Sequence, residues 1–552
     1  GDGVFIGKKA TVKRSIIWNN STIRENAKLD SCVISSRVEI GADSIIKNEA
    51  VIGDDCKIGS DSVIKSKIYI WPDKWIESGS TVTDNVKWGT LVRRSLFGIE
   101  GIKGLINLEI TPEFASKLGA AFGTSLRVGA KVVVGRDNKN ISRMIKRALI
   151  SGLMSAGVEV INAEIMPLPI IKYATRIFNA DAGISVKNPY SDTNSIIIRI
   201  FDQNGVDVNR KIETEIEDIF FKDKIKRVEP FNVGQVLHSA QTFEIYLNEI
   251  LKYITSSTIQ KIQKQRPKII LDCANGSSSI IAPTLFQKLG CEVISLNAQL
   301  AEGIGIKNSL ILDDSLSDLS KTVKALDADI GIALDEDAGR ALFVDNKGDV
   351  VEGDAALAFF VKSCLNEKKG GRICVPVSAS QIIDQICKEN NGKTVRSKIG
   401  YRPLIEKTLK NKCIFGGEDT GGFIFPDFQF ARDGILASSY MVKQIVKEEM
   451  SLNEFILEIP KFYMAKKIID VPYQYRGKIM LALIEEAYEH NLSTLDGVKI
   501  YFDYGWCLIR PGANENMFEI YSEAKSKNEA IQMNKHWANV IDDIVHTIET
   551  GI

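Results

Sequence analysis

The first ninety residues repeat a hydrophobic pattern with a period of six. Aliphatic side chains stand at every sixth position from Ile34 to Val82, and glycine or polar residues fill most positions between them. The same step runs earlier with one slip, at Ile6, Val12, Ile17, Ile23 and Leu29. One inward aliphatic residue per six fits neither an α-helix nor an amphipathic strand, whereas stacked coils of this kind enclose an aliphatic column. We therefore predict a left-handed parallel β-helix of hexapeptide repeats over residues 1–90.

A β-helix alone does not fix a function. Many hexapeptide β-helices transfer acyl groups with a catalytic histidine, but residues 1–90 contain no histidine. We therefore interpret the repeat as a spacer or an oligomerisation prism.

After Trp88 the pattern changes to strands that alternate with helices. Residues 131–135 form an apolar run, residues 141–157 have the apolar spacing of one helix face, and residues 158–161 form the next strand. The same succession returns twice, at 268–271, 282–289 and 292–295, and at 372–377, 381–389 and 393–396. It predicts three α/β domains with parallel sheets covered by helices. The last ninety residues predict an α+β domain, with helices at 478–490 and from 529 and strands at 498–502 and 518–522.

Composition narrows the choice of ligand. The chain has 552 residues, so several domains are expected, and its 70 basic residues balance 70 acidic ones. This balance gives no field that attracts nucleic acid or an anionic membrane, and no apolar run is long enough to cross a bilayer. Nine scattered cysteines and four scattered histidines predict neither disulfides nor a zinc site. We expect a cytoplasmic protein with a small-molecule ligand.

A series of short motifs follows in a fixed order. They are SLFGIEGIKG at 95–104, VGRD at 134–137, MPLP at 166–169, DCANG at 272–276, DEDAGR at 335–340, GGE at 416–418 and RP at 510–511. Together they resemble the α-D-phosphohexomutase family of phosphomannomutases and phosphoglucomutases. The resemblance implies mutase-like domains at 91–228, 229–345 and 346–458, and a C-terminal TATA-box-binding-protein-like domain at 459–552.

The family's reaction requires a phosphoserine nucleophile in a T-A-S-H-N-P loop. The corresponding loop here is I-S-V-K-N-P, which places Val186 at the phosphoserine and Lys187 at the histidine. Two alternatives remain open. Either Ser185 or Ser191 carries the phosphoryl group after a local shift, with Lys187 beside it, or these hydroxyls are ordinary turn residues.

The family's metal loop, D-x-D-x-D-R, implies Mg²⁺ bound by carboxylates. Asp335, Asp337 and Arg340 match it, but Gly339 replaces the third carboxylate, so we expect a weakened Mg²⁺ site. An acidic turn without metal is the alternative.

The resemblance also assigns residues to the sugar phosphate. Glu418 and Thr420 match the sugar loop G-E-x-S-G-H, in which Gly422 replaces the histidine. Arg510 and Asn514 lie in the phosphate loop, whose serine position is Gly512. A tight turn without a ligand is the alternative for this loop. From the VGRD motif, Arg136 is a further candidate for substrate binding.

The front of the chain resembles mannose-1-phosphate guanylyltransferase fusions, in which a nucleotidyltransferase domain precedes the β-helix. Residues 70–79 look like the end of that β-helix, and the first repeat begins without an initiator Met. We therefore expect a nucleotidyltransferase domain upstream, a sugar phosphate or nucleotide sugar as ligand, and a homo-oligomer.

The altered loops favour a degenerate mutase that binds sugar phosphate or serves assembly and regulation. An active phosphomannomutase or phosphoglucomutase that interconverts hexose-1-phosphate and hexose-6-phosphate is one alternative, and an oligomerisation scaffold is another.

Overall fold

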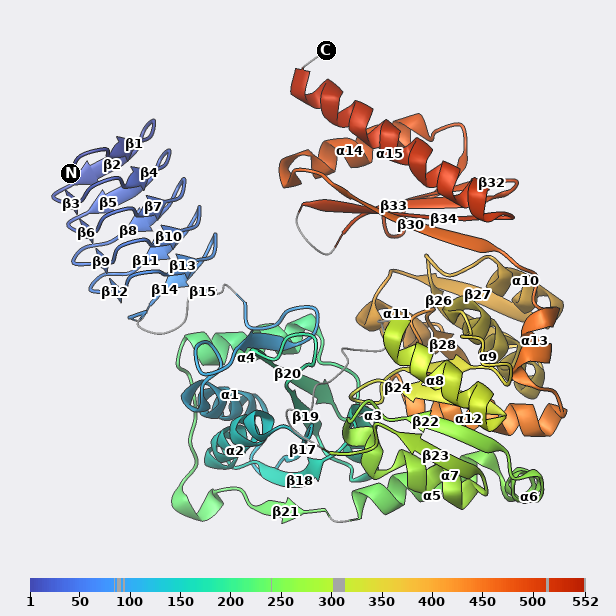
Figure 1. Cartoon of the computed structure of the whole chain (residues 1–552). Coiled ribbons are helices and arrows are strands. Elements are labelled where there is room, and N and C mark those ends of the chain that lie inside the picture. Colours follow the sequence, from blue (N-terminus) through green and yellow to red (C-terminus); the bar gives the residue numbers. More distant parts are fainter. Residues whose placement is uncertain are drawn as a thin grey trace. The chain divides into compact units, whose positions relative to one another are not determined.

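The computed structural model describes residues 1–83, 85–86, 91–92, 95–239, 241–300, 313–512 and 516–550. The chain forms two compact units (Figure 1). Unit 1 comprises Gly1–Ile165, Thr175–Gln203 and Asp207–Ala240, and unit 2 comprises Met166–Ala174, Asn204–Val206 and Gln241–Ile552.

Unit 1 begins with stacked coils whose strands form three parallel sheets. The first sheet contains β1 (Phe5–Ile6), β4 (Thr22–Ile23), β7 (Glu39–Ile40), β10 (Lys57–Ile58), β13 (Trp75–Ile76) and β15 (Leu91–Val92). The second contains β2 (Thr11–Lys13), β5 (Lys28–Asp30), β8 (Ile45–Ile46), β11 (Val63–Ile64) and β14 (Thr81–Val82). The third contains β3 (Ile16–Ile17), β6 (Val33–Ile34), β9 (Val51–Ile52) and β12 (Tyr69–Ile70). The predicted β-helix is confirmed.

The six-residue period places one aliphatic side chain of each strand inside the coil. Ile40, Ile52 and Ile64 are fully buried in a continuous column. Non-glycine residues with left-handed backbone, such as Asp43 and Asp61 at φ 58°, occupy the corners between strands. The column is therefore made by hydrophobic burial, and the polar residues between its members turn the chain.

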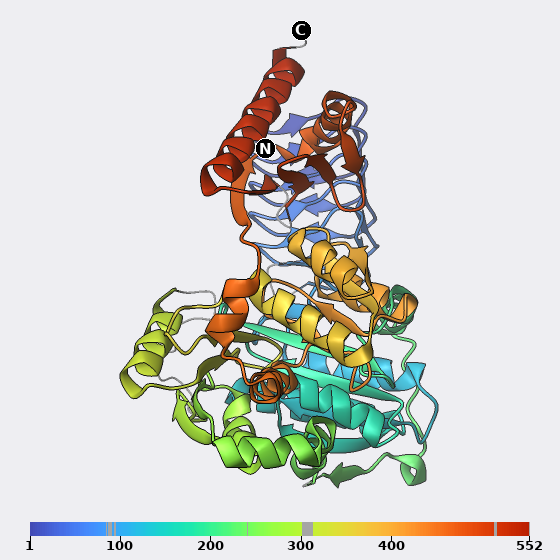
Figure 2. The same cartoon turned by 90° about the vertical axis from the view of Figure 1, so that its right-hand side faces the viewer.

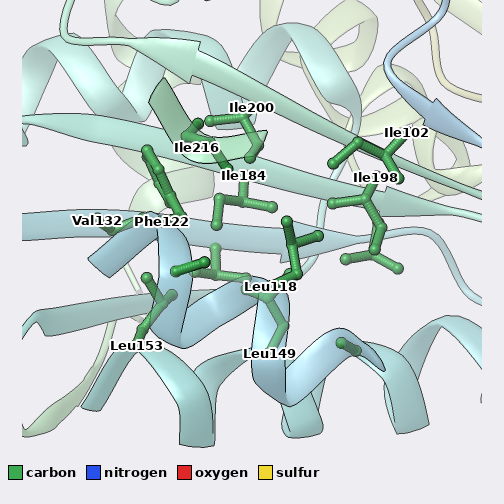
Figure 3. Packing of buried hydrophobic residues seen from close by; sticks show 14 of the residues in the cluster. Ile102, Leu118, Phe122, Val132, Leu149, Leu153, Ile184, Ile198, Ile200 and Ile216 are labelled. Carbon is green, nitrogen blue, oxygen red and sulfur yellow. The ribbon is translucent and has the colours of Figure 1, made fainter. Parts of the chain in front are cut away.

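The rest of unit 1 is an α/β domain with the strand order β16-β20-β19-β17-β18-β21. Its strands are β16 (Ile102–Leu105), β17 (Lys131–Arg136), β18 (Glu159–Ile165), β19 (Ala182–Lys187), β20 (Ser195–Asp202) and β21 (Val236–His238). Its helices are α1 (Pro112–Ser125), α2 (Asn140–Ser155) and α4 (Arg210–Phe221), and α3 (Leu168–Ile177) begins in unit 2. Figure 3 shows Leu118, Leu149 and Leu153 packed against Val132 and Ile184 of the sheet.

Unit 2 contains two further α/β sheets, in the orders β23-β22-β24-β25 and β27-β26-β28-β29. The first has β22 (Lys268–Asp272), β23 (Glu292–Leu296), β24 (Ile330–Leu334) and β25 (Ala341–Val344), with α5 (Thr242–Ile254), α6 (Ser256–Gln265), α7 (Ala282–Leu289) and α8 (Asp313–Leu326). The second has β26 (Gly371–Pro376), β27 (Gly392–Ser397), β28 (Phe415–Gly417) and β29 (Phe423–Ile424), with α9 (Gly353–Lys368), α10 (Ile382–Glu389), α11 (Tyr401–Lys410), α12 (Gly434–Glu448) and α13 (Leu452–Glu458).

Most neighbouring strands in the three α/β sheets run parallel, as predicted, but each sheet is mixed because it also contains an antiparallel strand. Strands β20, β25 and β29 each run antiparallel to the strand before them in the chain. A short connection returns each of them beside its neighbour, whereas a parallel pair needs a long crossover.

The end of unit 2 is an antiparallel sheet in the order β30-β34-β33-β32-β31, with helices α14 (Arg476–Glu486) and α15 (Lys527–Thr550), the latter in red in Figure 2. Its strands are β30 (Tyr463–Asp470), β31 (Asn491–Ser493), β32 (Val498–Phe502), β33 (Gly505–Pro511) and β34 (Met517–Ala524). Buried residues such as Ile479, Ile509 and Trp537 join both helices to the sheet. The predicted α+β domain is confirmed. None of the described helices is both long and apolar enough to span a bilayer.

Candidate functional site

Two of the predicted loops lie side by side in unit 2. The chain turns between β24 and β25 through residues 335–340, and between β28 and β29 through residues 418–422. The Ala341 backbone N–H donates to the Gly421 carbonyl at 3.0 Å, and the Leu168 N–H donates to the Asp337 carbonyl at 3.2 Å. The predicted metal loop, the sugar loop and the turn at 166–169 therefore meet in one place.

Glu418 is a buried carboxylate at the point where these loops meet, with 6% of its surface exposed. Arg432 lies beside it, with Nη2 at 2.8 Å from Oε1 and donating to Oε2 at 3.1 Å. A Cβ at Gly422 would come within 2.6 Å of both Glu418 Oε1 and Arg432 Cδ. Gly422, where the family has histidine, thus leaves room for the arginine. Thr420 lies exposed at the turn of the hairpin.

Two cationic side chains contact the same aromatic ring next to this ion pair. The Arg432 guanidinium lies 4.4 Å from the centre of the Tyr401 ring. Lys172 is almost fully buried at 1% exposure, and its Nζ donates to the Tyr401 hydroxyl at 2.8 Å. Two positive charges therefore lie around Tyr401, close to Glu418. Such a group suits an anion that also has hydroxyls, because the cations attract phosphate and the carboxylate accepts hydrogen bonds from hydroxyl groups.

The two carboxylates that match the metal loop are turned toward their own backbone. Asp335 Oδ1 accepts the Arg340 N–H at 3.0 Å, and Asp337 Oδ1 accepts the Gly339 N–H at 3.4 Å. Among the described residues no three or more His, Cys, Asp or Glu side chains gather as a cation site. The residues present do not provide a complete Mg²⁺ site by themselves, since a hard cation needs six or more oxygen ligands.

Arg510 lies at the end of β33, in the predicted phosphate loop. Its Nη1 is 3.6 Å from Asp496 Oδ2 and 4.0 Å from Glu519 Oε2. Arg476 donates to the Gly512 carbonyl at 3.0 Å and so adds a second cation to the loop. Asn514 lies outside the described residues.

The segment that matches the nucleophile loop belongs to unit 1 and comprises the end of β19 and the turn after it. Alternation along this strand puts Val186 on one face and Ser185 and Lys187 on the other. Val186 is fully buried in the apolar cluster between the sheet and its helices, and Ser185 is 7% exposed. Ser191 lies exposed in the turn after the strand. Position 186 therefore faces the core.

Arg136 and Asp137 close the end of β17 next to this loop. Asp137 Oδ2 accepts the Asn188 N–H at 2.7 Å, and its Oδ1 accepts the Lys139 N–H at 2.9 Å. Burial raises the pKa of Asp137 to about 6, although these hydrogen bonds oppose the rise. Arg136 is 6% exposed and donates to the Asp137 carbonyl at 2.7 Å. The VGRD motif thus holds two strands together at their carboxyl ends.

The motifs missed three side chains of the site in unit 2, which are Lys172, Tyr401 and Arg432. Lys172 is the one of the three that the sequence could best have predicted. It lies among the apolar residues of α3, and a buried lysine rarely lacks a partner. Tyr401 and Arg432 lie outside the quoted motifs, and only the fold brings them to Glu418.

Models of known domain families match four consecutive parts of the chain. Models of the phosphoglucomutase/phosphomannomutase alpha/beta/alpha domains I, II and III match residues 94–227, 244–348 and 352–463. A model of the GMPPB C-terminal domain matches residues 1–86.

Relatives and solved structures cover the part after the β-helix. A phosphoglucomutase/phosphomannomutase of Thermococcus kodakarensis is 36% identical over 440 residues, which are 79% of this chain and 96% of that protein. A probable phosphoglucosamine mutase of Pyrococcus abyssi is 33% identical over 454 residues, 81% of this chain and 98% of that protein. A phosphoglucomutase/phosphomannomutase family protein of Burkholderia thailandensis has the same fold, with a TM-score of 0.71 at 20% identity over 82% of this chain and 98% of that one.

Proposed function

We propose, from the premise that this chain belongs to the phosphoglucomutase/phosphomannomutase family, that its ligand is a hexose phosphate and that its chemistry is the interconversion of hexose-1-phosphate and hexose-6-phosphate.

The observation that carries the proposal is the burial of the Glu418 carboxylate. A carboxylate that is 94% buried is costly unless it serves an ion pair or a ligand. Arg432 supplies the ion pair, and Lys172 adds a second cation at the Tyr401 ring beside it. A sugar hydroxyl that donates to Glu418 would place its phosphate within reach of these cations.

The names of the relatives and the residues of the nucleophile loop favour different answers to the question of whether this chain is an active mutase. The relatives bear the names of mutases, which favours an active enzyme over the degenerate mutase that the altered loops predict. An active enzyme would have to carry the phosphoryl group on Ser185 or Ser191, with Lys187 beside the nucleophile. Val186 in the apolar core favours the second candidate, hexose-phosphate binding without turnover.

The match of residues 1–86 to the GMPPB C-terminal domain supports a place for this chain in a sugar-nucleotide pyrophosphorylase fusion. In that setting a nucleotide sugar is a second ligand to test at the same site.

Isothermal titration of the full chain with glucose-1-phosphate and mannose-1-phosphate tests the binding. Glu418→Gln keeps the size of the side chain and removes its charge, so we expect the dissociation constant to rise at least tenfold, equivalent to about 1.4 kcal/mol. Glu448→Gln changes an exposed acid on α12 and serves as the matched control.

Incubation with hexose-1-phosphate, glucose-1,6-bisphosphate and Mg²⁺, followed by ³¹P NMR and mass spectrometry of the peptide 183–195, tests turnover. Hexose-6-phosphate together with a phosphopeptide supports the mutase, and Ser185→Ala and Ser191→Ala then identify the carrier. Binding without product supports the second candidate. If neither hexose phosphates nor nucleotide sugars bind, both candidates fail and a scaffold role is left.

A further inference from the structure

Arg432 lies outside the sequence motifs, yet its backbone is held in a fixed place. It pairs with Ile424 of β29 through an isolated antiparallel bridge. The next residue, Asp433, is fully buried and caps α12, where its Oδ1 accepts the Leu436 N–H at 2.9 Å. The β28–β29 hairpin and the start of α12 therefore determine where the Arg432 side chain begins.

A single nitrogen of Arg432 contacts both oxygens of Glu418. Nη2 lies 2.8 Å from Oε1 and donates to Oε2 at 3.1 Å, and the side chains of Arg432 and Glu418 are only 15% and 8% exposed. The terminal torsion of a glutamate takes a broad range of values when nothing holds it. Contact with both oxygens restricts this rotation, and it uses only part of the roughly four acceptor positions that a carboxylate offers. The remaining acceptor positions therefore have fixed directions.

The ring of Tyr401 holds the arginine from another side. Arg432 Cζ lies 4.4 Å from the centre of this ring, a distance at which a cation is attracted to an aromatic face. The Tyr401 hydroxyl accepts a hydrogen bond from Lys172 Nζ at 2.8 Å, and Lys172 is only 1% exposed. A buried side chain thus fixes the ring on which the guanidinium lies.

Gly422 provides space for the pair and is not required by backbone conformation. Its φ lies outside the left-handed region that favours glycine. A Cβ at this position would lie 2.6 Å from both Glu418 Oε1 and Arg432 Cδ, which is closer than an ordinary contact. Neutralising Glu418 would need only a nearby cation, whereas this arrangement fixes the position of both partners.

We propose that Arg432 is a positioning residue, which fixes the Glu418 carboxylate in the orientation that accepts hydrogen bonds from hydroxyl groups of the sugar. Tyr401 and Lys172 hold the arginine in place, and Gly422 leaves the space in which it lies. Arg432 acts on the ligand through Glu418, since the carboxylate and the ring both engage its guanidinium. The inference rests on the proposed function, which gives Glu418 a sugar hydroxyl to bind.

A double-mutant cycle, measured by isothermal titration of the full chain with glucose-1-phosphate and mannose-1-phosphate, tests the positioning role. In the native background, Arg432→Met should raise the dissociation constant at least tenfold. In the Glu418→Gln background the same substitution should change it by less than about twofold, because the effects of residues that act through one another are not additive. An arginine that bound the phosphate directly would lower the affinity by a similar factor in both backgrounds.

Gly422→Ala displaces the pair without removing either charge, so the test remains decisive if Arg432→Met does not fold. Its Cβ would meet Glu418 Oε1, and we expect the dissociation constant to rise about fivefold or more. Arg432→Lys keeps the charge but loses the planar contact with the ring, so it should recover only part of the affinity that Arg432→Met loses. The thermal unfolding midpoint of each variant checks that it is folded.

Arg372→Met is the matched control, because Arg372 is exposed at the amino end of β26, whereas Glu418 follows the carboxyl end of the parallel strand β28. Its dissociation constant should stay within about twofold of the native value. Equal losses for Arg432→Met in both backgrounds, or native affinity in Gly422→Ala, would overturn the positioning role and leave the proposed function intact. A native chain that binds no hexose phosphate would overturn the proposed function and this inference with it.

Discussion

At the scale of single residues, the alternation of side chains along β19 decides which groups can take part in chemistry. The motif predicted that valine replaces the phosphoserine, and the structure adds the direction in which that position faces. Val186 is fully buried in the apolar cluster, on the opposite face from Ser185. A hydroxyl placed at 186 would therefore point toward hydrocarbon.

Val186→Ser should accordingly destabilise the first α/β domain and should not restore a nucleophile. Burying an unbonded hydroxyl in place of two methyl groups costs about 1–3 kcal/mol. Faster hydrogen exchange in peptides from β17 and β19 measures the loss. Ser185→Ala is the control on the other face, with a change below about 0.5–1 kcal/mol. A phosphopeptide of the variant that carries the phosphoryl group at position 186 would contradict the assigned direction.

Position 339 offers a gain of function. The nearest atom to a Cβ on Gly339 is Asp337 Oδ1 at 3.4 Å, which is an ordinary contact distance. Gly339→Asp should therefore fold without strain and add a third carboxylate to the loop. We expect calorimetry to detect tighter Mg²⁺ binding, by about tenfold or more, because cation affinity rises with the number of charged ligands.

The matched control is Gly421→Asp in the neighbouring loop. Its φ of +87° and a carbonyl oxygen 2.6 Å from the Cβ position make that substitution strained. It should lower the thermal midpoint and leave Mg²⁺ binding weak. Equal Mg²⁺ affinity in the native chain and in Gly339→Asp would count against a cation site at this loop.

At the scale of elements, period and alternation predicted most of the fold from the sequence. Helix 282–289 and strand 498–502 were predicted with their observed bounds. The antiparallel strands β20, β25 and β29 could not be seen in the pattern, because an apolar run reads the same in either direction. Tyr401 and Arg432 reach Glu418 only through tertiary packing, so the loop motifs found part of the site and missed its cations.

The aliphatic column allows a direct test of the β-helix. Ile52 is fully buried in the middle of the column, whereas Ile6 belongs to the same series and is 50% exposed at its end. Ile52→Ala should cost about 2–5 kcal/mol, because it leaves a cavity that stacked coils cannot close.

Ile6→Ala should cost less than about 1 kcal/mol, since its side chain is already half in water. Thermal melting of both variants by circular dichroism compares them. Similar losses at the two positions would mean that the column does not stabilise the coils.

A buried lysine joins β32 to the end of β26 within unit 2. Lys499 is 1% exposed, its Nζ donates to the Val377 carbonyl at 2.7 Å, and it lies 3.5 Å from the centre of the Trp506 ring. Burial is the main cause that lowers the pKa of Lys499 to about 7, and Arg396 adds to it. Folding thus shifts the Lys499 side chain toward its neutral form, compared with the unfolded state.

Because the pKa of Lys499 is lowered on folding, its contribution to stability is complete above the unfolded pKa of about 10.4 and is lost as the pH falls through about 7. We expect the thermal midpoint of unit 2 to fall more between about pH 9 and pH 6 in the native chain than in Lys499→Met. Lys478→Met removes an exposed lysine and should keep the native pH dependence.

At the scale of the whole molecule, charge balance governs solubility. The chain has 70 basic and 70 acidic residues, and its isoelectric point is about 7.1. A net charge close to zero removes the repulsion that keeps molecules apart. Light scattering should therefore find the lowest solubility near neutral pH and higher solubility about one to two pH units on either side. A minimum far from neutrality would mean that the pKa values of many side chains are shifted together.

The stacked coils also determine how this chain can change in length. Partners on adjacent coils are eighteen positions apart at Arg37 and Asp55, and seventeen apart at Asp2 and Asn19. Insertion of one full coil would lengthen the stack by about 4.8 Å and return every later residue to its own face. Insertion of six residues would rotate the rest of the stack onto the next face, so that every later residue would change sheets. During evolution this segment is therefore expected to gain or lose residues only in whole coils.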